Sequence, residues 1–325
     1  MANDIFSSID PDVNIFSCLQ PSSLDSPLLA PSSLYNTIPS TPDLFSLLHL
    51  NARSLFNKIN HLNILLSEIN HSFSIIGISE TWLDDTSGPI ISIPDYTFIY
   101  NNRKNKTGGG VGLFVSNKYD FIVRHDLCPY EDCIEWLAIE VIASSTNILI
   151  FIIYRPPNTD PLLFSNHLSS SLNQKSIRNK QIYIMGDFNI NLLNNDVNNI
   201  SANFSNLMSS MNLIPLINSP TRITDHSSTL IDNIFTNNIQ KHTSVVLCND
   251  ISDHFPICTF AAFSPKANPI DKHHKYLLNP SNISALNKYL FDYDWHEILT
   301  SQDVNSAFKN FIDVIHLGLN SHCSH

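Results

Sequence analysis

The sequence predicts a layered α/β fold, because short apolar segments of strand length alternate with segments of helical periodicity. The first predicted strand is Leu44–Leu50, and the second is Phe73–Ile78. Between them, apolar residues recur at helical spacing, at Ile59, Leu62, Leu65, Leu66 and Ile69. Polar residues follow both strands, Asn51 after the first and Glu80 after the second. In such folds, reactive side chains gather where strands end and loops begin.

The rest of the domain continues this alternation. Helices are expected at Leu162–Leu172 and near Phe204–Met211. Strands are expected at Val111–Val115, Trp136–Ile142, Asn147–Tyr154, Gln181–Met185, Leu230–Thr236, Ser244–Cys248 and Pro256–Phe260. The glycine run Gly108–Gly110 precedes the first of these strands. No Lys-Ser or Lys-Thr follows it, so a tight turn into the strand is favoured over a phosphate-binding loop.

The two ends of the chain differ in composition from this central part. Residues 1–43 are rich in Ser, Pro, Asn and Asp without periodicity, so we expect a disordered leader there. The domain itself is expected to span residues 44–263. Residues 264–325 are interpreted as a polar linker and a helical connector, with short helices at Leu286–Leu290, Trp295–Leu299 and Ala307–Leu319.

Composition limits the classes of function. The net charge of −11 is unusual for a nucleic-acid binder, unless acidic groups gather around a bound cation. The six cysteines lack zinc-site spacing, which favours free thiols in a reducing compartment. The N-terminus lacks the pattern of a signal peptide. The most apolar stretch, Ile148–Tyr154, is too short to span a bilayer. We therefore expect a soluble intracellular protein with no membrane partner.

Eight polar residues lie at or near the ends of predicted strands: Asn51, Glu80, Tyr154, Asp187, Asn189, Asp232, Asp253 and His254. Hydrolysis of a phosphodiester needs a hard cation held by carboxylates, a base for the attacking water and donors for the phosphate. This set contains all three kinds of group.

Each of these residues also has an interpretation without catalysis. Asp187 within Gly-Asp-Phe-Asn suits a turn, and the Asp253-His254 pair suits a loop cap. Glu80 suits a surface acid, and Tyr154 suits a core aromatic residue with a bonded hydroxyl. The catalytic interpretation is favoured because all of these alternatives would have to hold together.

Seven motifs in order carry a resemblance to a known family. They are His49–Ser54 (H-L-N-A-R-S), Ser79–Leu83 (S-E-T-W-L), Gly108–Gly112 (G-G-G-V-G), Tyr154–Pro157 (Y-R-P-P), Gly186–Asn189 (G-D-F-N), Leu230–Phe235 (L-I-D-N-I-F) and Ser252–Pro256 (S-D-H-F-P). Together they resemble the endonuclease/exonuclease/phosphatase superfamily. The particular residues within these motifs resemble the endonuclease domain of jockey-like non-LTR retrotransposons, an apurinic-endonuclease-like group. The resemblance spans about Leu44 to Phe260.

The resemblance implies a fold and a function. The fold is a four-layer α/β sandwich in which two packed mixed β-sheets are flanked by helices. The function is an Mg²⁺-dependent DNA endonuclease, with Mn²⁺ as an acceptable substitute, that nicks its target and leaves a 3′-hydroxyl for target-primed reverse transcription. Its partners would be target DNA and, if the parent chain is longer, the element RNA and a reverse transcriptase domain. A nuclear location follows from the same resemblance.

The resemblance also assigns metal-side roles. Glu80 resembles the principal metal carboxylate, Asn51 the amide that supports the metal and phosphate site, and Asp253 a further metal-side carboxylate. Apurinic repair enzymes often carry an acidic residue two positions after the asparagine, where this chain has Arg53. That departure favours a function in transposition over one in repair, and it leaves the number of metal ions open.

The other five residues resemble the groups that act on the phosphate and the water. Asp187 resembles the residue that orients or deprotonates the attacking water, and Asn189 a phosphate-binding amide. Tyr154 resembles a phosphate-contacting phenol. His254 resembles the imidazole at the scissile phosphate, and Asp232 the carboxylate that holds its tautomer.

Several alternatives stay open at this point. The basic residues Arg103, Lys104 and Lys106 either form a solvated face or touch the DNA backbone. The enzyme could instead be an apurinic repair nuclease or a phosphatase on the same scaffold, or an inactive remnant that only binds nucleic acid. Residues Tyr276–Leu319 resemble the connector before a reverse transcriptase, and no polymerase motif follows them. We therefore expect a truncated element or a domesticated fragment, without polymerase activity.

Overall fold

The computed structural model describes residues 26–40, 44–84, 87–103, 108–128, 135–143, 146–194, 199–263, 280–301 and 303–323. Contacts within the chain divide it into two units, Met1–Ala267 and Asn268–His325.

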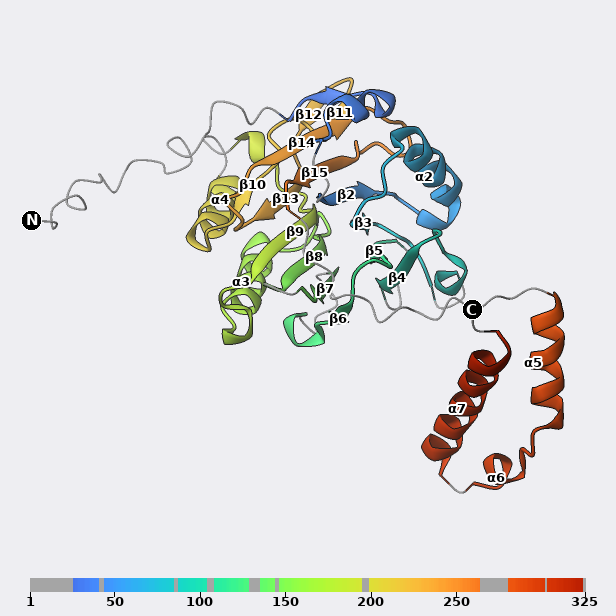
Figure 1. The fold of residues 1–325 in the computed structure, drawn as a ribbon. Coiled ribbons are helices and arrows are strands. Elements are labelled where there is room, and N and C mark those ends of the chain that lie inside the picture. The colour runs from blue at the N-terminus through green and yellow to red at the C-terminus, as the bar shows by residue number, and fades with distance from the viewer. Residues whose placement is uncertain are drawn as a thin grey trace, which may run out of the picture. The chain divides into compact units, whose positions relative to one another are not determined.

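Two mixed β-sheets form the frame of the first unit (Figure 1). The seven-stranded sheet has the order β1 (Leu28–Leu29), β14 (His242–Leu247), β15 (Ile257–Ala261), β2 (Phe45–Asn51), β3 (Ile75–Ser79), β5 (Val111–Ser116) and β4 (Tyr96–Asn101). The six-stranded sheet has the order β10 (Ile214–Pro215), β13 (Asp232–Thr236), β9 (Gln181–Asp187), β8 (Ile148–Tyr154), β7 (Glu135–Val141) and β6 (Phe121–Val123). A small hairpin is formed by β11 (Arg222–Thr224) and β12 (Ser227–Thr229).

Alternation of side chains along the strands divides the apolar residues into layers. In β2, Phe45 and Leu47 belong to the core between the sheets, whereas Leu48 and Leu50 belong to the core under a helix. That helix is α2 (Leu55–Ile69). Successive strand residues point to opposite faces, so one buried strand supplies both cores.

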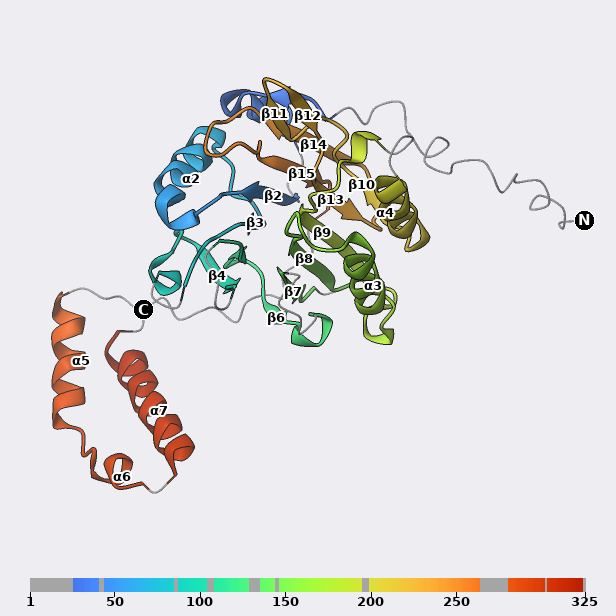
Figure 2. The ribbon, with the colours of Figure 1, turned by 180° about the vertical axis from the view of Figure 1, so that it is seen from behind.

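The helices cover the two outer faces. Helix α2 packs on the seven-stranded sheet, and helices α3 (Pro161–Leu172) and α4 (Asn199–Ser210) pack on the six-stranded sheet through Phe164 and Phe204. Figures 1 and 2 show α2 on one outer side of the first unit and α3 with α4 on the other. The four layers confirm the predicted fold class.

Strand register brings the ends of several strands to one place. Asn51 at the end of β2 pairs with Ser79 at the end of β3. In the other sheet, Asp187 at the end of β9 pairs with Tyr154 on one side and with Asp232 on the other. Because β2 alternates, Asn51 shares the inner face with Leu47, so its amide points toward the second sheet.

The domain begins earlier than the predicted boundary at residue 44. Within the predicted leader, Leu28–Leu29 pairs with Val246 and Leu247 of β14, and Leu34 of the 3₁₀ helix Pro31–Asn36 is completely buried. The disordered leader is therefore corrected for residues 26–40, while residues 1–25 and 41–43 lie outside the described part. Backbone pairing, hydrogen bonds between Ser26 and Asn218, and the buried residues Pro31 and Leu34 hold this segment, and none of these produces a periodic sequence signal.

The second unit is helical. It contains α5 (Pro280–Asp292), α6 (His296–Leu299) and α7 (Val304–His322). Helices α5 and α7 contact each other, and the ring of Tyr289 lies 5.4 Å from that of His322. Within the described ranges, no helix combines the length and apolarity needed to cross a bilayer.

Candidate active site

Asn51 links two carboxylates from different parts of the chain. Its side-chain Nδ2 donates to Glu80 Oε1 at 2.9 Å and to Asp187 Oδ2 at 2.9 Å. Its backbone oxygen accepts from Ser252 Oγ at 2.6 Å. Through its side-chain amide and its backbone oxygen, the single buried residue Asn51 therefore connects the end of β2 with the loop after β3, the end of β9 and the loop before β15.

The Glu80 carboxylate is held by an unusual backbone. Glu80 and Trp82 both have φ of 52°. The Trp82 N–H donates to the Gly109 oxygen at 2.8 Å, and the Glu80 oxygen accepts from the Ser54 N–H at 2.9 Å. The Trp82 indole also donates to Glu80 Oε2 at 3.0 Å. Left-handed conformations of non-glycine residues cost energy and persist where surrounding contacts fix them, which is frequent at functional sites.

Asp187 is almost completely buried, at 1% exposure, and accepts several hydrogen bonds. Oδ1 accepts from the Asn189 N–H at 2.9 Å, and Oδ2 accepts from the side chains of Asn51 and Asn189. Burial and the charge of Asp232 raise the pKa of Asp187 well above its usual range, while His254 and these hydrogen bonds act in the opposite direction. A carboxylate with a raised pKa takes up a proton more readily, as a base for water must.

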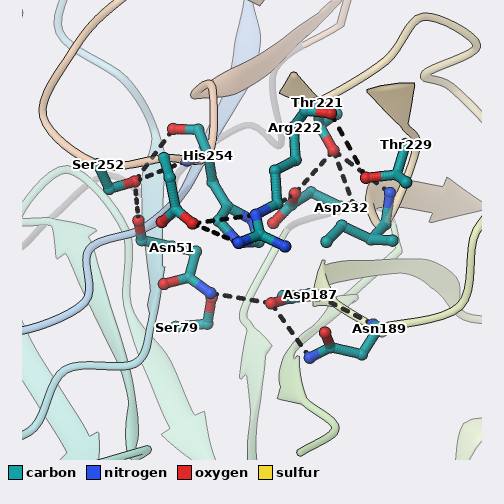
Figure 3. Close-up of polar contacts among 12 residues, drawn as sticks. Asn51, Ser79, Asp187, Asn189, Thr221, Arg222, Thr229, Asp232, Ser252 and His254 are labelled. Carbon is teal, nitrogen blue, oxygen red and sulfur yellow. Dashed lines mark hydrogen bonds and ion pairs between the residues drawn. The ribbon is translucent and has the colours of Figure 1, made fainter. Parts of the chain in front are cut away.

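His254 and Asp232 form a buried pair (Figure 3). His254 Nδ1 lies 2.8 Å from Asp232 Oδ2, which also accepts from Thr221 Oγ1 at 2.7 Å. The other oxygen, Oδ1, accepts no hydrogen bond from the described residues, and His49 Nδ1 lies 3.8 Å from it. Asp232 therefore fixes the orientation of the His254 ring through one oxygen.

The charge state of His254 follows from this pairing. Burial lowers the pKa of His254, but the charge and hydrogen bond of Asp232, with the charges of Asp187 and Asp253, outweigh it and raise the pKa to about 9. The imidazole is then positively charged at neutral pH. The ligand atoms of Asp187, Asp232 and His254 all lie within 4.8 Å of one another. These three side chains could hold a metal ion, and while His254 is protonated it presents a positive charge that can bind an anion.

Tyr154 is the neutral member of the site. It is 6% exposed, and burial together with the charges of Glu80 and Asp187 raises the pKa of its phenol. The phenol therefore keeps its proton and can donate a hydrogen bond to an anion.

Asp253 occupies a different setting from the other carboxylates. Arg222 Nη2 lies 2.7 Å from Asp253 Oδ2, and Arg53 Nη1 lies 3.0 Å from Asp253 Oδ1. Burial raises the pKa of Asp253, but the hydrogen bonds from the two arginines outweigh burial and lower it to about 2. Both oxygens face guanidinium groups, and the metal-side role of Asp253 stays a prediction.

The predicted basic cluster is only partly described. Arg103 forms an ion pair with buried Glu135, whose carboxylate also accepts the Gly110 N–H. Arg103, whose side chain is 20% exposed, therefore contributes to the packing of the glycine turn, and a contact with DNA stays a prediction. Lys104 and Lys106 lie outside the described residues.

Arg155 is a site residue that the sequence did not single out beyond its motif. It is 3% exposed, and its guanidinium donates to the oxygens of Phe188, Asn189 and Thr159 at 2.6, 2.7 and 2.5 Å. Its own oxygen accepts from Asn189 Nδ2 at 2.8 Å. The Y-R-P-P motif was the available signal, because the carbonyl partners of Arg155 cannot be read from the sequence.

We expect Arg155→Lys to lower the free energy of unfolding by about 2–4 kcal/mol, because an ammonium group cannot reach three carbonyl oxygens and leaves some without a donor. Urea unfolding measures this. The matched control is Arg178→Lys, at an exposed position. Equal stability of the two variants would show that the three bonds do not hold the loop after β9.

We also expect the stability of the metal-free protein to depend on the charge of His254. Its folded pKa of about 9 exceeds the ordinary 6.5, so the contribution is complete below pH 6.5 and is lost as pH rises through about 9. The linked free energy is on the order of 3 kcal/mol. Urea unfolding in EDTA should show the advantage of the natural protein over His254→Gln shrinking at alkaline pH. If the difference in the free energy of unfolding between the two proteins stayed constant with pH, it would contradict the raised pKa of His254.

Comparisons with known proteins agree with this geometry. A family model described as "Endonuclease/Exonuclease/phosphatase family" matches residues 48–254. No protein of curated function is matched in sequence. Among solved structures, the endonuclease domain of TRAS1, a telomere-specific non-LTR retrotransposon, matches with a TM-score of 0.55 and 13% identity, covering 67% of this chain and 98% of that one.

Two further structures are apurinic-type nucleases or their relatives. AP endonuclease LMAP from Leishmania major matches with a TM-score of 0.57 and 12% identity, covering 74% of this chain and 93% of that one. The catalytic domain of Xenopus laevis APE2 matches with a TM-score of 0.54 and 15% identity, covering 69% and 94%. At these identities the likeness concerns the fold alone.

Proposed function

Because the chain belongs to the endonuclease/exonuclease/phosphatase family, whose members are hydrolytic nucleases and phosphatases, we propose that it is an Mg²⁺-dependent DNA endonuclease. One observation carries the proposal. The buried base Asp187 and the protonated His254–Asp232 pair meet at the ends of strands from both sheets. This is the arrangement that water attack on a phosphodiester requires.

The side chains present fit a hard divalent cation, which prefers carboxylate and amide oxygens. The donors are the carboxylates of Glu80, Asp187 and Asp232 and the amide of Asn51. A buried Asp232 oxygen without a hydrogen-bond donor among the described residues is consistent with a nearby cation. We propose Glu80 and Asn51 as the principal holders. A cation there would neutralise charge on the phosphate and lower the pKa of bound water.

The protein's own groups have distinct roles in this proposal. Asp187 orients the attacking water and accepts its proton. His254, charged at neutral pH, binds the oxygens of the scissile phosphate as negative charge grows on them, and Asp232 keeps the ring in position. Tyr154 and Asn189 add neutral donors to the same phosphate.

The finer proposal is that the substrate is intact DNA and that the nick serves a non-LTR retrotransposon. The L-N-A-R-S, S-E-T-W-L and Y-R-P-P motifs support it. The nick would carry a 3′-hydroxyl to prime reverse transcription of the element RNA, in the nucleus, by a reverse transcriptase domain of a longer parent chain.

A comparison of substrates tests this proposal. The protein is offered supercoiled plasmid, a duplex with one abasic site, and 4-nitrophenyl phosphate. We expect nicks in plasmid that a DNA polymerase can extend, because the ends carry 3′-hydroxyls. A strong preference for the abasic duplex would indicate a repair nuclease, and activity on the monoester alone would indicate a phosphatase. DNA binding without cleavage in Mg²⁺ and in Mn²⁺ would indicate an inactive remnant.

A further inference from the structure

Two arginines are held side by side at the edge of the active site by one carboxylate. Arg222 donates to Asp253 through Nε at 2.9 Å and Nη2 at 2.7 Å, while Arg53 approaches the other oxygen at 3.0 Å. The side chains of Arg53 and Arg222 are 47% and 40% exposed, whereas that of Asp253 is 30% exposed. The carboxylate lies beneath, and the guanidinium groups remain open to solvent.

The backbone ties both arginines to the catalytic residues. Arg53 has φ of 43°, and its N–H donates to Asn51 Oδ1 at 3.2 Å. Arg222 directly follows Thr221, whose hydroxyl donates to Asp232 and whose oxygen accepts the Phe255 N–H at 2.7 Å. Figure 3 shows Arg222 beside His254 and Asp232. The backbones of the two arginines are therefore held next to Asn51 and Asp232, and their guanidinium groups are held by Asp253.

The local charge is positive in an otherwise acidic chain. Arg53 and Arg222 carry two positive charges against the single negative charge of Asp253, whereas the whole chain carries −11. Two guanidinium forks fixed in place match the oxygens of a phosphate better than lysines do.

We propose that Asp253 anchors Arg53 and Arg222 so that they bind a backbone phosphate of the DNA strand beside the one that is cleaved. The proposal rests on the proposed endonuclease function and adds a second phosphate position to it. It also explains how an acidic protein could bind DNA, through a small cationic site next to the reaction centre and without a broad basic surface.

The test measures DNA binding in EDTA, where no cleavage occurs. Affinity for a short fluorescein-labelled duplex is followed by anisotropy over a range of salt concentrations. For Arg53→Ala/Arg222→Ala we expect roughly tenfold weaker binding at low salt, and a fall of about one in the slope of log affinity against log salt, because one phosphate contact is lost. The matched control, Lys175→Ala/Arg178→Ala, removes two exposed cations before β9, at the end of that strand remote from Asp187, and should behave as the natural protein.

A second variant tests whether weaker DNA binding by the double alanine variant comes from a loss of fold. Arg53→Lys/Arg222→Lys keeps the charges, so the salt slope should stay near that of the natural protein although affinity falls. Unchanged affinity and slope in the double alanine variant would overturn the inference, and so would equal losses in the Lys175→Ala/Arg178→Ala control.

Parallel measurements separate this inference from the proposed function. If the natural protein nicked plasmid and the double alanine variant showed an unaltered salt slope, the endonuclease function would be supported and the second phosphate site would be rejected. A lowered slope with no nicking would support the phosphate site and reject the endonuclease. Asp253→Asn should also leave Mn²⁺ affinity in a direct titration unchanged. A large loss of Mn²⁺ affinity would indicate that Asp253 is a metal ligand and would overturn its role as an anchor.

Discussion

Asp187→Ala is expected to lower the rate of DNA nicking by about 10²–10⁴-fold, the usual contribution of a general base or a well-placed electrostatic group. The reason lies in its surroundings. Asp187 is buried, has a raised pKa and is linked through Asn51 to Glu80. Its removal takes away both the proton acceptor and the partner that orders the Asn51 amide.

The measurement is the rate of plasmid nicking under single-turnover conditions, with urea unfolding to follow the fold. We expect a change of less than about 2 kcal/mol in the free energy of unfolding, because an ionised carboxylate is itself unfavourable in a buried position. The control is Asp120→Ala, which removes an exposed aspartate. Nicking by Asp187→Ala at the rate of the control would show that the base lies elsewhere.

The second large effect concerns His254 and Asp232 as a unit. His254→Ala should reduce nicking by about 10²–10⁴-fold, because the cation for the phosphate is lost. Asp232→Asn should cost somewhat less, since the amide can still accept a hydrogen bond from the ring but no longer raises its pKa. In the double variant the two losses should not add, because Asp232 acts through His254.

A double-mutant cycle on nicking rates measures this coupling. The pH profile supplies a readout that a purely structural role would not alter. With Asp232→Asn, activity should decline at a lower pH than in the natural protein, because the pKa of about 9 depends on the Asp232 charge. Fully additive losses and an unshifted profile would remove Asp232 from its role as the holder of the imidazole.

Much of the fold could be predicted because its strongest signals are local. The spacing of Leu62, Leu65 and Ile69 predicted α2, and these residues do lie on its buried face. Strands that are buried on both faces appear as unbroken apolar runs, as in Ile148–Tyr154. Strands of only two or three residues were missed, including Leu28–Leu29 and the hairpin Arg222–Thr224 with Ser227–Thr229, because they are too short to show a periodic pattern.

The sequence predicted which residues belong to the candidate site, but it did not predict all of the contacts between them. Asn51, Glu80 and Asp187 are joined by hydrogen bonds, as expected for residues that follow strands meeting at one place. The setting of Asp253 could not be predicted, because its partner Arg222 is 31 residues away in the chain. Arg155 escaped notice because backbone carbonyls, its partners, leave no trace in a sequence.

The most direct test of the central claim is nicking of supercoiled plasmid by the purified natural protein, with Mg²⁺ and then with excess EDTA. The proposed function predicts conversion to open circles with Mg²⁺ and none with EDTA. A folded protein that produces no open circles with either Mg²⁺ or Mn²⁺, or that nicks equally well in EDTA, would contradict it.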